Sequence, residues 1–208
     1  MLIRVDEFPR CDQSGRLMFD PWVILGEFMA TLRAPFCLAV VVGSGLDDWA
    51  TGNDLERLRK LDGVTLAAHG FGHVRYTFHS PSSLAELAKF FPSGIAVPPF
   101  NGLNQATVGA LAQGGFKYVC TGPETRRDCD AIRFDGIREV PSAYYGHLCD
   151  SPTLLDADHK VPFGVLDCVT LHSCWESCTA PRFEYLQRFA DIYRDEIVPW
   201  SALIGGNS

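Results

Sequence analysis

Short apolar, β-branched runs alternate with amphipathic segments along most of this chain. The runs predict strands at residues 1–6, 36–42, 64–68, 94–97, 116–120 and 164–171. Helical spacing or helix-capping residues predict helices between them, at 21–32, 53–60, 81–90, 104–113 and 182–197. The run at 36–42 is apolar throughout, as in a strand covered on both faces. This alternation predicts a parallel sheet flanked by helices.

Residues 122–160 interrupt the alternation, because they are rich in Asp, Arg, Pro and Gly. We expect an irregular insertion there, with a short strand near residues 137–141. No repeat or interdomain linker is visible, so residues 1–208 are predicted to form one domain. Its length suits a distorted (β/α) barrel with about seven parallel strands, and an open doubly wound sheet is the alternative.

Composition and charge exclude several classes of protein. The 18 basic and 25 acidic residues give a net charge of −7, the wrong sign for a surface that binds phosphates, so we expect no nucleic-acid partner. No apolar stretch approaches the roughly 20 residues of a membrane span. Charged residues at positions 4, 6 and 7 occupy the place of a signal peptide's apolar core, so a cytoplasmic location is expected. Most of the eight cysteines are then expected to be reduced and buried.

Residues able to carry out chemistry follow four of the predicted strands. They are Asp6 with Glu7, His69 with His73, the segment 98–101 (Pro-Pro-Phe-Asn), and His172. Loops after the carboxyl ends of parallel strands converge on one rim, so these residues are expected to meet. Two imidazoles and a carboxylate around an open position are a common arrangement for a catalytic zinc ion.

Each of these positions also has a purely structural explanation. A single histidine is often a hydrogen-bonded core or surface residue, and the spacing of His69 and His73 is weak by itself. The two glycines between them favour a loop or an opening helical turn that brings the imidazoles together. Asp6 and Glu7 could form a solvated strand end, although burying two carboxylates without a cation is costly. His172 could likewise be structural.

Taken in order, the four segments resemble the motifs of the polysaccharide deacetylases, the NodB-homology or carbohydrate esterase family. That family has Asp-Asp after its first strand, His-x-x-x-His after a middle strand, Arg-Pro-Pro-Tyr or similar after the next, and Leu-His after a late strand. The matching segments here are Asp6-Glu7, His69 to His73, Val97-Pro98-Pro99-Phe100 and Leu171-His172. They span most of the chain, and the resemblance is to a divergent deacetylase-like branch.

The resemblance implies a metal-dependent active site. Glu7, His69 and His73 would hold one divalent ion, with zinc preferred and cobalt, manganese or nickel as alternatives. Asp6 would be the general base that takes a proton from water, and His172 would protonate the leaving amine. Glu7 replaces the family's second aspartate but keeps a carboxylate donor.

Substrate contacts are implied by the same resemblance. Pro99, Phe100 and Asn101 would line the substrate or oxyanion position. Trp175 and Glu176 are candidates only because they follow His172, and an aromatic residue near a strand end more often serves packing. Val97 stands where the family has the arginine that orients its catalytic aspartate, and no Asp-x-x-Asp-Trp segment can be located. These differences leave open how the base is supported.

The function expected from the resemblance is removal of an N-acyl group, N-acetyl in the simplest case, from an amino sugar. A cytoplasmic location favours a nucleotide- or lipid-linked precursor of a surface polysaccharide as the small-molecule partner. Two alternatives remain: a catalytically silent carbohydrate-binding or scaffolding homologue, and a hydrolase of a non-sugar amide or an ester.

Overall fold

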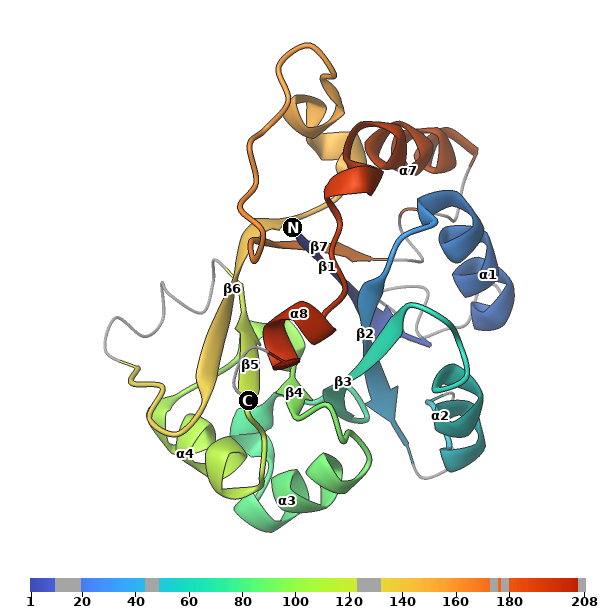
Figure 1. The fold of residues 1–208 in the computed structure, drawn as a ribbon. Helices are drawn as coiled ribbons and strands as arrows, with labels where there is room; N and C mark the ends of the chain where they lie inside the picture. Colours follow the sequence, from blue (N-terminus) through green and yellow to red (C-terminus); the bar gives the residue numbers. More distant parts are fainter. Residues whose placement is uncertain (10–19, 44–48, 123–131, 173–175, 177–179, 206–208) are drawn as a thin grey trace. The chain divides into compact units, whose positions relative to one another are not determined.

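Parallel strands form a closed barrel in this computed structural model, which describes residues 1–9, 20–43, 49–122, 132–172, 176 and 180–205. The strands follow one another around the barrel in chain order, β1 to β7 (Figure 1). They are β1 (Leu2–Phe8), β2 (Phe36–Val42), β3 (Val64–Phe71), β4 (Ile95–Ala96), β5 (Tyr118–Thr121), β6 (Arg138–Tyr145) and β7 (Cys168–His172). The predicted barrel is therefore confirmed, and the open doubly wound sheet is wrong.

Helices follow most of the strands, as the alternating pattern predicts. The α-helices are α1 (Pro21–Leu32), α2 (Gly52–Leu58), α3 (Pro81–Lys89), α4 (Gln105–Gln113), α7 (Ala180–Tyr193) and α8 (Ser201–Ile204). Short 3₁₀ turns lie at η1 (Tyr76–Phe78), η2 (Pro99–Asn101), η3 (Leu148–Asp150), η4 (Pro152–Leu155) and η5 (Arg194–Glu196). The carboxylate of Asp20 caps α1 by accepting a hydrogen bond from the Trp22 N–H at 2.8 Å, as its N-cap position predicts.

Some element boundaries differ from the sequence prediction. Helix α2 begins earlier than expected, because Thr51 rather than Asn53 caps it in a reciprocal capping box with Asp54. Strand β3 runs on to Phe71 instead of ending at Ala68. The short strand expected near residues 137–141 of the insertion is present as β6, which pairs in parallel with β5 from Tyr118↔Arg138 to Thr121↔Pro141 but runs on to Tyr145.

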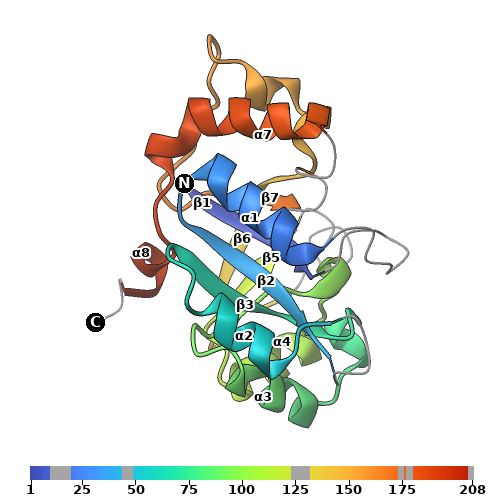
Figure 2. The same cartoon turned by 90° about the vertical axis from the view of Figure 1, so that its right-hand side faces the viewer.

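The chain divides into two compact units. The first comprises Met1–Leu38, Leu61–Thr65 and Ala143–Ser208. In this unit β1 pairs in parallel with β7, from Leu2↔Cys168 to Asp6↔His172. Helices α1 and α7 pack against each other (Figure 2). The buried indole of Trp200 donates a hydrogen bond to the Ile3 carbonyl at 2.7 Å, which attaches the C-terminal segment to β1.

The second unit comprises Ala39–Lys60 and Leu66–Ser142. It contains the β3–β4–β5 ladder, with Ala68 opposite Ala96 and Ala96 opposite Val119. Helices α3 and α4 lie side by side in it (Figure 2). The small residues on these strands are fully buried. That the whole chain is a single domain stays a prediction.

Two further expectations concern the described part of the chain only. No helix there is long and apolar enough to cross a membrane. Cys37, Cys120, Cys149 and Cys168 form no disulfide with one another. The other four cysteines lie outside the described residues.

Candidate active site

The first unit brings the predicted base and the predicted acid together. Asp6 on β1 and His172 on β7 are direct partners in the parallel ladder, each near the carboxyl end of its strand. Both are buried, with 3 % and 6 % of their surface exposed. Two groups able to transfer protons therefore occupy neighbouring positions at one end of a rigid two-strand ladder.

Arg4 lies two residues before Asp6 and makes a bidentate ion pair with it. Its Nε donates to Oδ1 of Asp6 and its Nη2 to Oδ2, both at 2.9 Å. The Arg4 side chain is fully buried. Sequence reasoning gave Arg4 no role. The i, i+2 spacing was the available signal, because alternate residues of a strand point to the same face.

Aromatic and ionisable groups surround His172. The ring of Tyr145 meets the imidazole edge-on at 5.6 Å between centroids, and the ring of His147 lies 5.3 Å from it. Glu176 is almost completely buried and its Oε1 accepts a hydrogen bond from the Leu148 N–H at 3.2 Å. The same oxygen lies 3.7 Å from Nδ1 of His147.

Glu7 follows Asp6 on β1 and has an unusual backbone. Its φ of 72° lies in the left-handed region, which a residue with a Cβ seldom adopts. Such strain is found preferentially at functional positions. Trp175, the other predicted site residue near His172, lies outside the described residues.

The second unit holds the two predicted metal-binding histidines. His69 and His73 are buried, and their ring centroids lie 5.0 Å apart. Nδ1 of His69 lies 2.8 Å from the Val97 carbonyl oxygen. A carbonyl can only accept, so Nδ1 carries the proton, and in the neutral imidazole Nε2 then keeps its lone pair. Metal-binding histidines are commonly oriented in this way.

The segment that carries the histidines differs from the predicted loop. His69 belongs to β3 itself, and only His73 lies in the turn that follows. Gly70 lies between them with a φ of 90°, and an added Cβ would come within 3.1 Å of Pro99 and 3.3 Å of the Val74 carbonyl. The glycine lets the end of the strand bend so sharply that the second imidazole turns back beside the first.

His73 is held by a left-handed backbone and by aromatic neighbours. Its φ is 55°. The ring of Trp49 stacks on it at 6.1 Å, and the ring of Phe100 lies 4.7 Å from it. The rings of Trp49 and Phe100 thus restrict the imidazole of His73 and fix the direction of its nitrogens.

The predicted substrate residues form η2, directly after β4. Pro99 and Asn101 are buried, whereas Phe100 is 56 % exposed. Phe100 and Asn101 are both left-handed, with φ values of 56° and 50°. The guanidinium of Arg75 lies over the Phe100 ring at 5.8 Å. Phe100 is thus the one exposed side chain of these three, with Arg75 and His73 beside its ring.

Tyr76 is hydrogen-bonded to the strand that carries His69. Its hydroxyl donates to the Ala68 carbonyl at 2.8 Å, directly before His69. Burial raises the pKa of Tyr76 well above the ordinary tyrosine value, and nearby Cys120 raises it further. The hydroxyl therefore stays a neutral donor at physiological pH.

Comparison with known proteins places this fold. The chain resembles a family 4 carbohydrate esterase from Streptomyces lividans, solved with acetate, at 11 % identity and a TM-score of 0.54, over 95 % of this chain and 90 % of that one. It resembles a T48 deacetylase solved with substrate at 12 % identity and a TM-score of 0.53, over 100 % and 91 %. No protein-family model and no curated protein matches the sequence.

A third similar structure has a different activity. The 4-α-glucanotransferase from Thermococcus litoralis matches at 13 % identity and a TM-score of 0.60, over all of this chain but 40 % of that one. The chain therefore has the carbohydrate deacetylase fold, a barrel that an enzyme of another activity also contains. At these identities the likeness concerns the fold, so the function must be argued from the residues.

Proposed function

We propose that this protein is a metal-dependent hydrolase that removes an N-acyl group, N-acetyl in the simplest case, from an amino sugar. The observation that carries the proposal is the orientation of the His69 and His73 side chains, which suits metal binding. The Val97 carbonyl favours the His69 tautomer with its proton on Nδ1, so that Nε2 can offer its lone pair to a metal ion. His73 is held beside it in a strained left-handed conformation. Such strain must be offset elsewhere, which favours a functional role.

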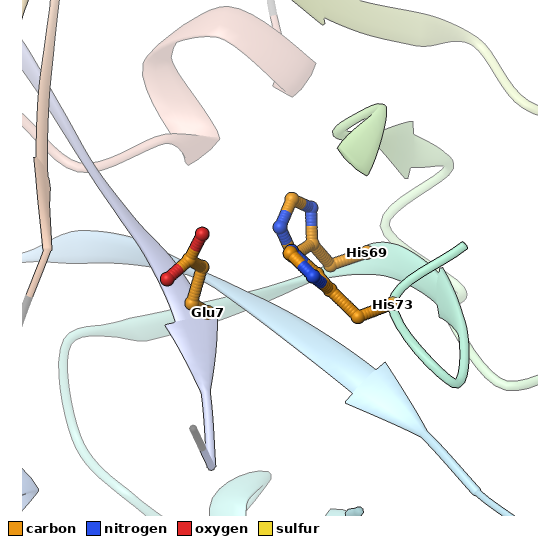
Figure 3. Close-up of side chains that lie close together, drawn as sticks. All are labelled: Glu7, His69 and His73. Carbon is orange, nitrogen blue, oxygen red and sulfur yellow. The ribbon is translucent and has the colours of Figure 1, made fainter. Parts of the chain in front are cut away.

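The proposed ligands of one divalent ion are Glu7, His69 and His73, drawn in Figure 3. Each offers one donor atom, and two neutral imidazoles with a carboxylate match the preference of zinc. Cobalt, manganese and nickel accept the same donors. A bound ion of this kind supplies Lewis-acid polarisation of the acyl carbonyl and activation of water.

Asp6 and His172 would move the protons. The Asp6 carboxylate accepts a proton from the attacking water, whose oxygen forms the new bond to the acyl carbon. His172 donates a proton to the amide nitrogen as the C–N bond breaks, so a carboxylic acid and an amine leave. Their positions as ladder partners support this division, because both groups are fixed by the same strand pair.

Phe100 is the proposed platform for the sugar. An exposed aromatic face next to His73 can pack against the apolar face of a pyranose ring. A nucleotide- or lipid-linked amino sugar in the cytoplasm is the substrate class that we propose from the sequence.

A metal and acetate assay tests the proposal. Purified full-length protein is stripped of metal, reloaded with zinc, cobalt, manganese or nickel, and offered N-acetyl amino sugars, free and nucleotide-linked. We expect one ion per chain and metal-dependent release of acetate. Matched simple amides and acetate esters separate a sugar deacetylase from a general amidase or esterase. Protein that binds no ion and releases no acetate would contradict the proposal and favour the silent homologue.

A further inference from the structure

Arg4 places a positively charged guanidinium within the buried, mostly apolar part of β1. Its neighbours Ile3 and Val5 and its ladder partner Thr170 are fully buried, as is Arg4 itself. Taking a guanidinium out of water is costly and is seldom repaid by a single ion pair. A hydrophobic residue would serve the core of this strand at least as well, so the stability of the barrel does not account for Arg4.

What Arg4 adds is a fixed orientation of one carboxylate. Nε and Nη2 lie on one edge of a rigid planar group, and they engage both oxygens of Asp6 at 2.9 Å. A fork of this kind fixes both the position and the plane of the carboxylate. Each carboxylate oxygen keeps a second acceptor position beyond the one Arg4 uses. Asp6 is therefore restrained without losing its capacity to accept a proton.

The same guanidinium also contacts a neighbour of His172. The carbon at the centre of the Arg4 guanidinium lies 5.9 Å from the centroid of the Tyr145 ring, and that ring forms a T-shaped pair with His172. Arg4 thus touches Asp6 directly and restrains His172 through one aromatic ring. All four residues belong to the first unit.

We propose that Arg4 is a positioning residue that sets the orientation of Asp6 and, through Tyr145, of His172. The inference rests on the proposed function, in which Asp6 and His172 transfer protons. In this arrangement Arg4 transfers no proton itself, and its guanidinium acts through its hydrogen bonds to the Asp6 carboxylate. It acts by keeping the base and the acid in one fixed arrangement throughout the reaction.

Arg4→Lys is the decisive variant, because lysine keeps the charge but lacks the planar fork. We expect kcat to fall about 100-fold, the scale of a displacement of about 1 Å at a reacting group. KM and metal content should stay within about twofold, since lysine leaves ligands and substrate contacts intact. Arg194→Lys is the matched control. Arg194 donates to the carbonyls of Leu32 and Thr31 in the same unit, so kcat should not change.

A double variant separates positioning from general damage to the fold. In an Asp6→Asn background, Arg4→Lys should reduce the residual rate less than about twofold, because the group that it positions is already lost. A full further loss in that background, or an unchanged kcat in Arg4→Lys alone, overturns the proposal. Should Arg4→Lys fail to fold, Tyr145→Leu takes its place. It must then lower kcat at least threefold, and an unchanged kcat overturns the proposal.

A crystal structure of Arg4→Lys gives a readout that needs no activity. We expect the Asp6 carboxylate to rotate out of its present plane while β1 and β7 keep their register. A carboxylate that stays in place overturns the proposal. If wild-type protein hydrolyses no acyl sugar but the carboxylate rotates in the variant, positioning by Arg4 stands and the proposed function fails.

Discussion

The β1/β7 region and the β3/β4 region arrange ionisable groups by opposite means. In the first, a buried carboxylate is held by a full charge, the Arg4 guanidinium. In the second, an imidazole is held by a main-chain carbonyl, and the next imidazole by a strained backbone and aromatic rings. Charged side chains fix the carboxylate in the first region, whereas uncharged groups fix the imidazoles in the second.

The difference suits the two chemical tasks of the proposed function. A proton-transfer group must keep its orientation while its own charge changes, and a bidentate partner provides that. A histidine that binds a metal ion must present the lone pair of one ring nitrogen, and a carbonyl acceptor on the other ring nitrogen favours that without adding a competing cation. Apart from the proposed ligand Glu7 on β1, we therefore expect substitutions in β1/β7 to change rates and substitutions in β3/β4 to change metal binding.

The largest effect is expected at His69. His69→Ala removes one of three proposed ligands, so zinc affinity should fall more than about 100-fold, beyond the loss typical of a residue that only supports a ligand. Metal-dependent activity should disappear with it. Calorimetric titration with zinc measures the loss. His79→Ala is the control, because His79 packs against Phe71 and Tyr76 in the same unit. Equal zinc affinity in His69→Ala and wild type would remove His69 from the metal site.

The next effect separates two neighbours on β1. Asp6→Asn should lower kcat by about 10²- to 10⁴-fold with metal retained, because it removes the base and leaves the ligands. Glu7→Gln should instead weaken metal binding. Metal analysis and acetate release on both proteins check this. If Asp6→Asn loses the metal and Glu7→Gln keeps it, the two roles are reversed.

His172 should show its role through the leaving group. His172→Ala should lower hydrolysis of an N-acetyl sugar by about 10²- to 10⁴-fold with unchanged metal content. An amine departs poorly without a proton, whereas nitrophenolate departs unaided, so nitrophenyl acetate should be affected much less. Parallel steady-state assays on the two substrates measure the ratio. Equal losses would indicate that His172 binds substrate or supports the fold.

The smallest effect is expected for Tyr76, which is hydrogen-bonded to β3 and should influence stability at high pH. The folded state raises the pKa of Tyr76, so this residue's contribution is complete below its ordinary value of about 10 and is lost as the pH rises through the folded pKa. Tyr76→Phe should cost about 1 kcal/mol at neutral pH, since the hydrogen bond to Ala68 is lost. It should also flatten the fall in stability above pH 10.

Urea unfolding at neutral and alkaline pH measures the effect of Tyr76. Tyr185→Phe is the control, because Tyr185 is exposed and solvated in both states. A Tyr76→Phe protein that loses stability above pH 10 as steeply as wild type would contradict the assignment to Tyr76.

The sequence by itself determined the elements and their order. Strand β2 and helix α1 begin and end where the hydrophobic pattern and the Asp20-Pro21 start signal place them. These features are local, because hydrophobic periodicity and capping depend on residues a few positions apart. The order of four short motifs also indicated the deacetylase fold, which the structural comparisons support at low identity.

Tertiary structure decided the groups that hold the chemistry in place. Val97 replaces an arginine of the resembling family, and the sequence left the support of Asp6 open. The structure shows that Arg4 on the same strand binds that carboxylate, while the Val97 carbonyl fixes His69. Every residue has a main-chain carbonyl, so the sequence does not mark the one that accepts a hydrogen bond from a histidine. Whether a strand residue faces a carboxylate or solvent depends on how the barrel closes. The i, i+2 spacing makes a contact between Arg4 and Asp6 possible, but only the three-dimensional packing decides which of these contacts form.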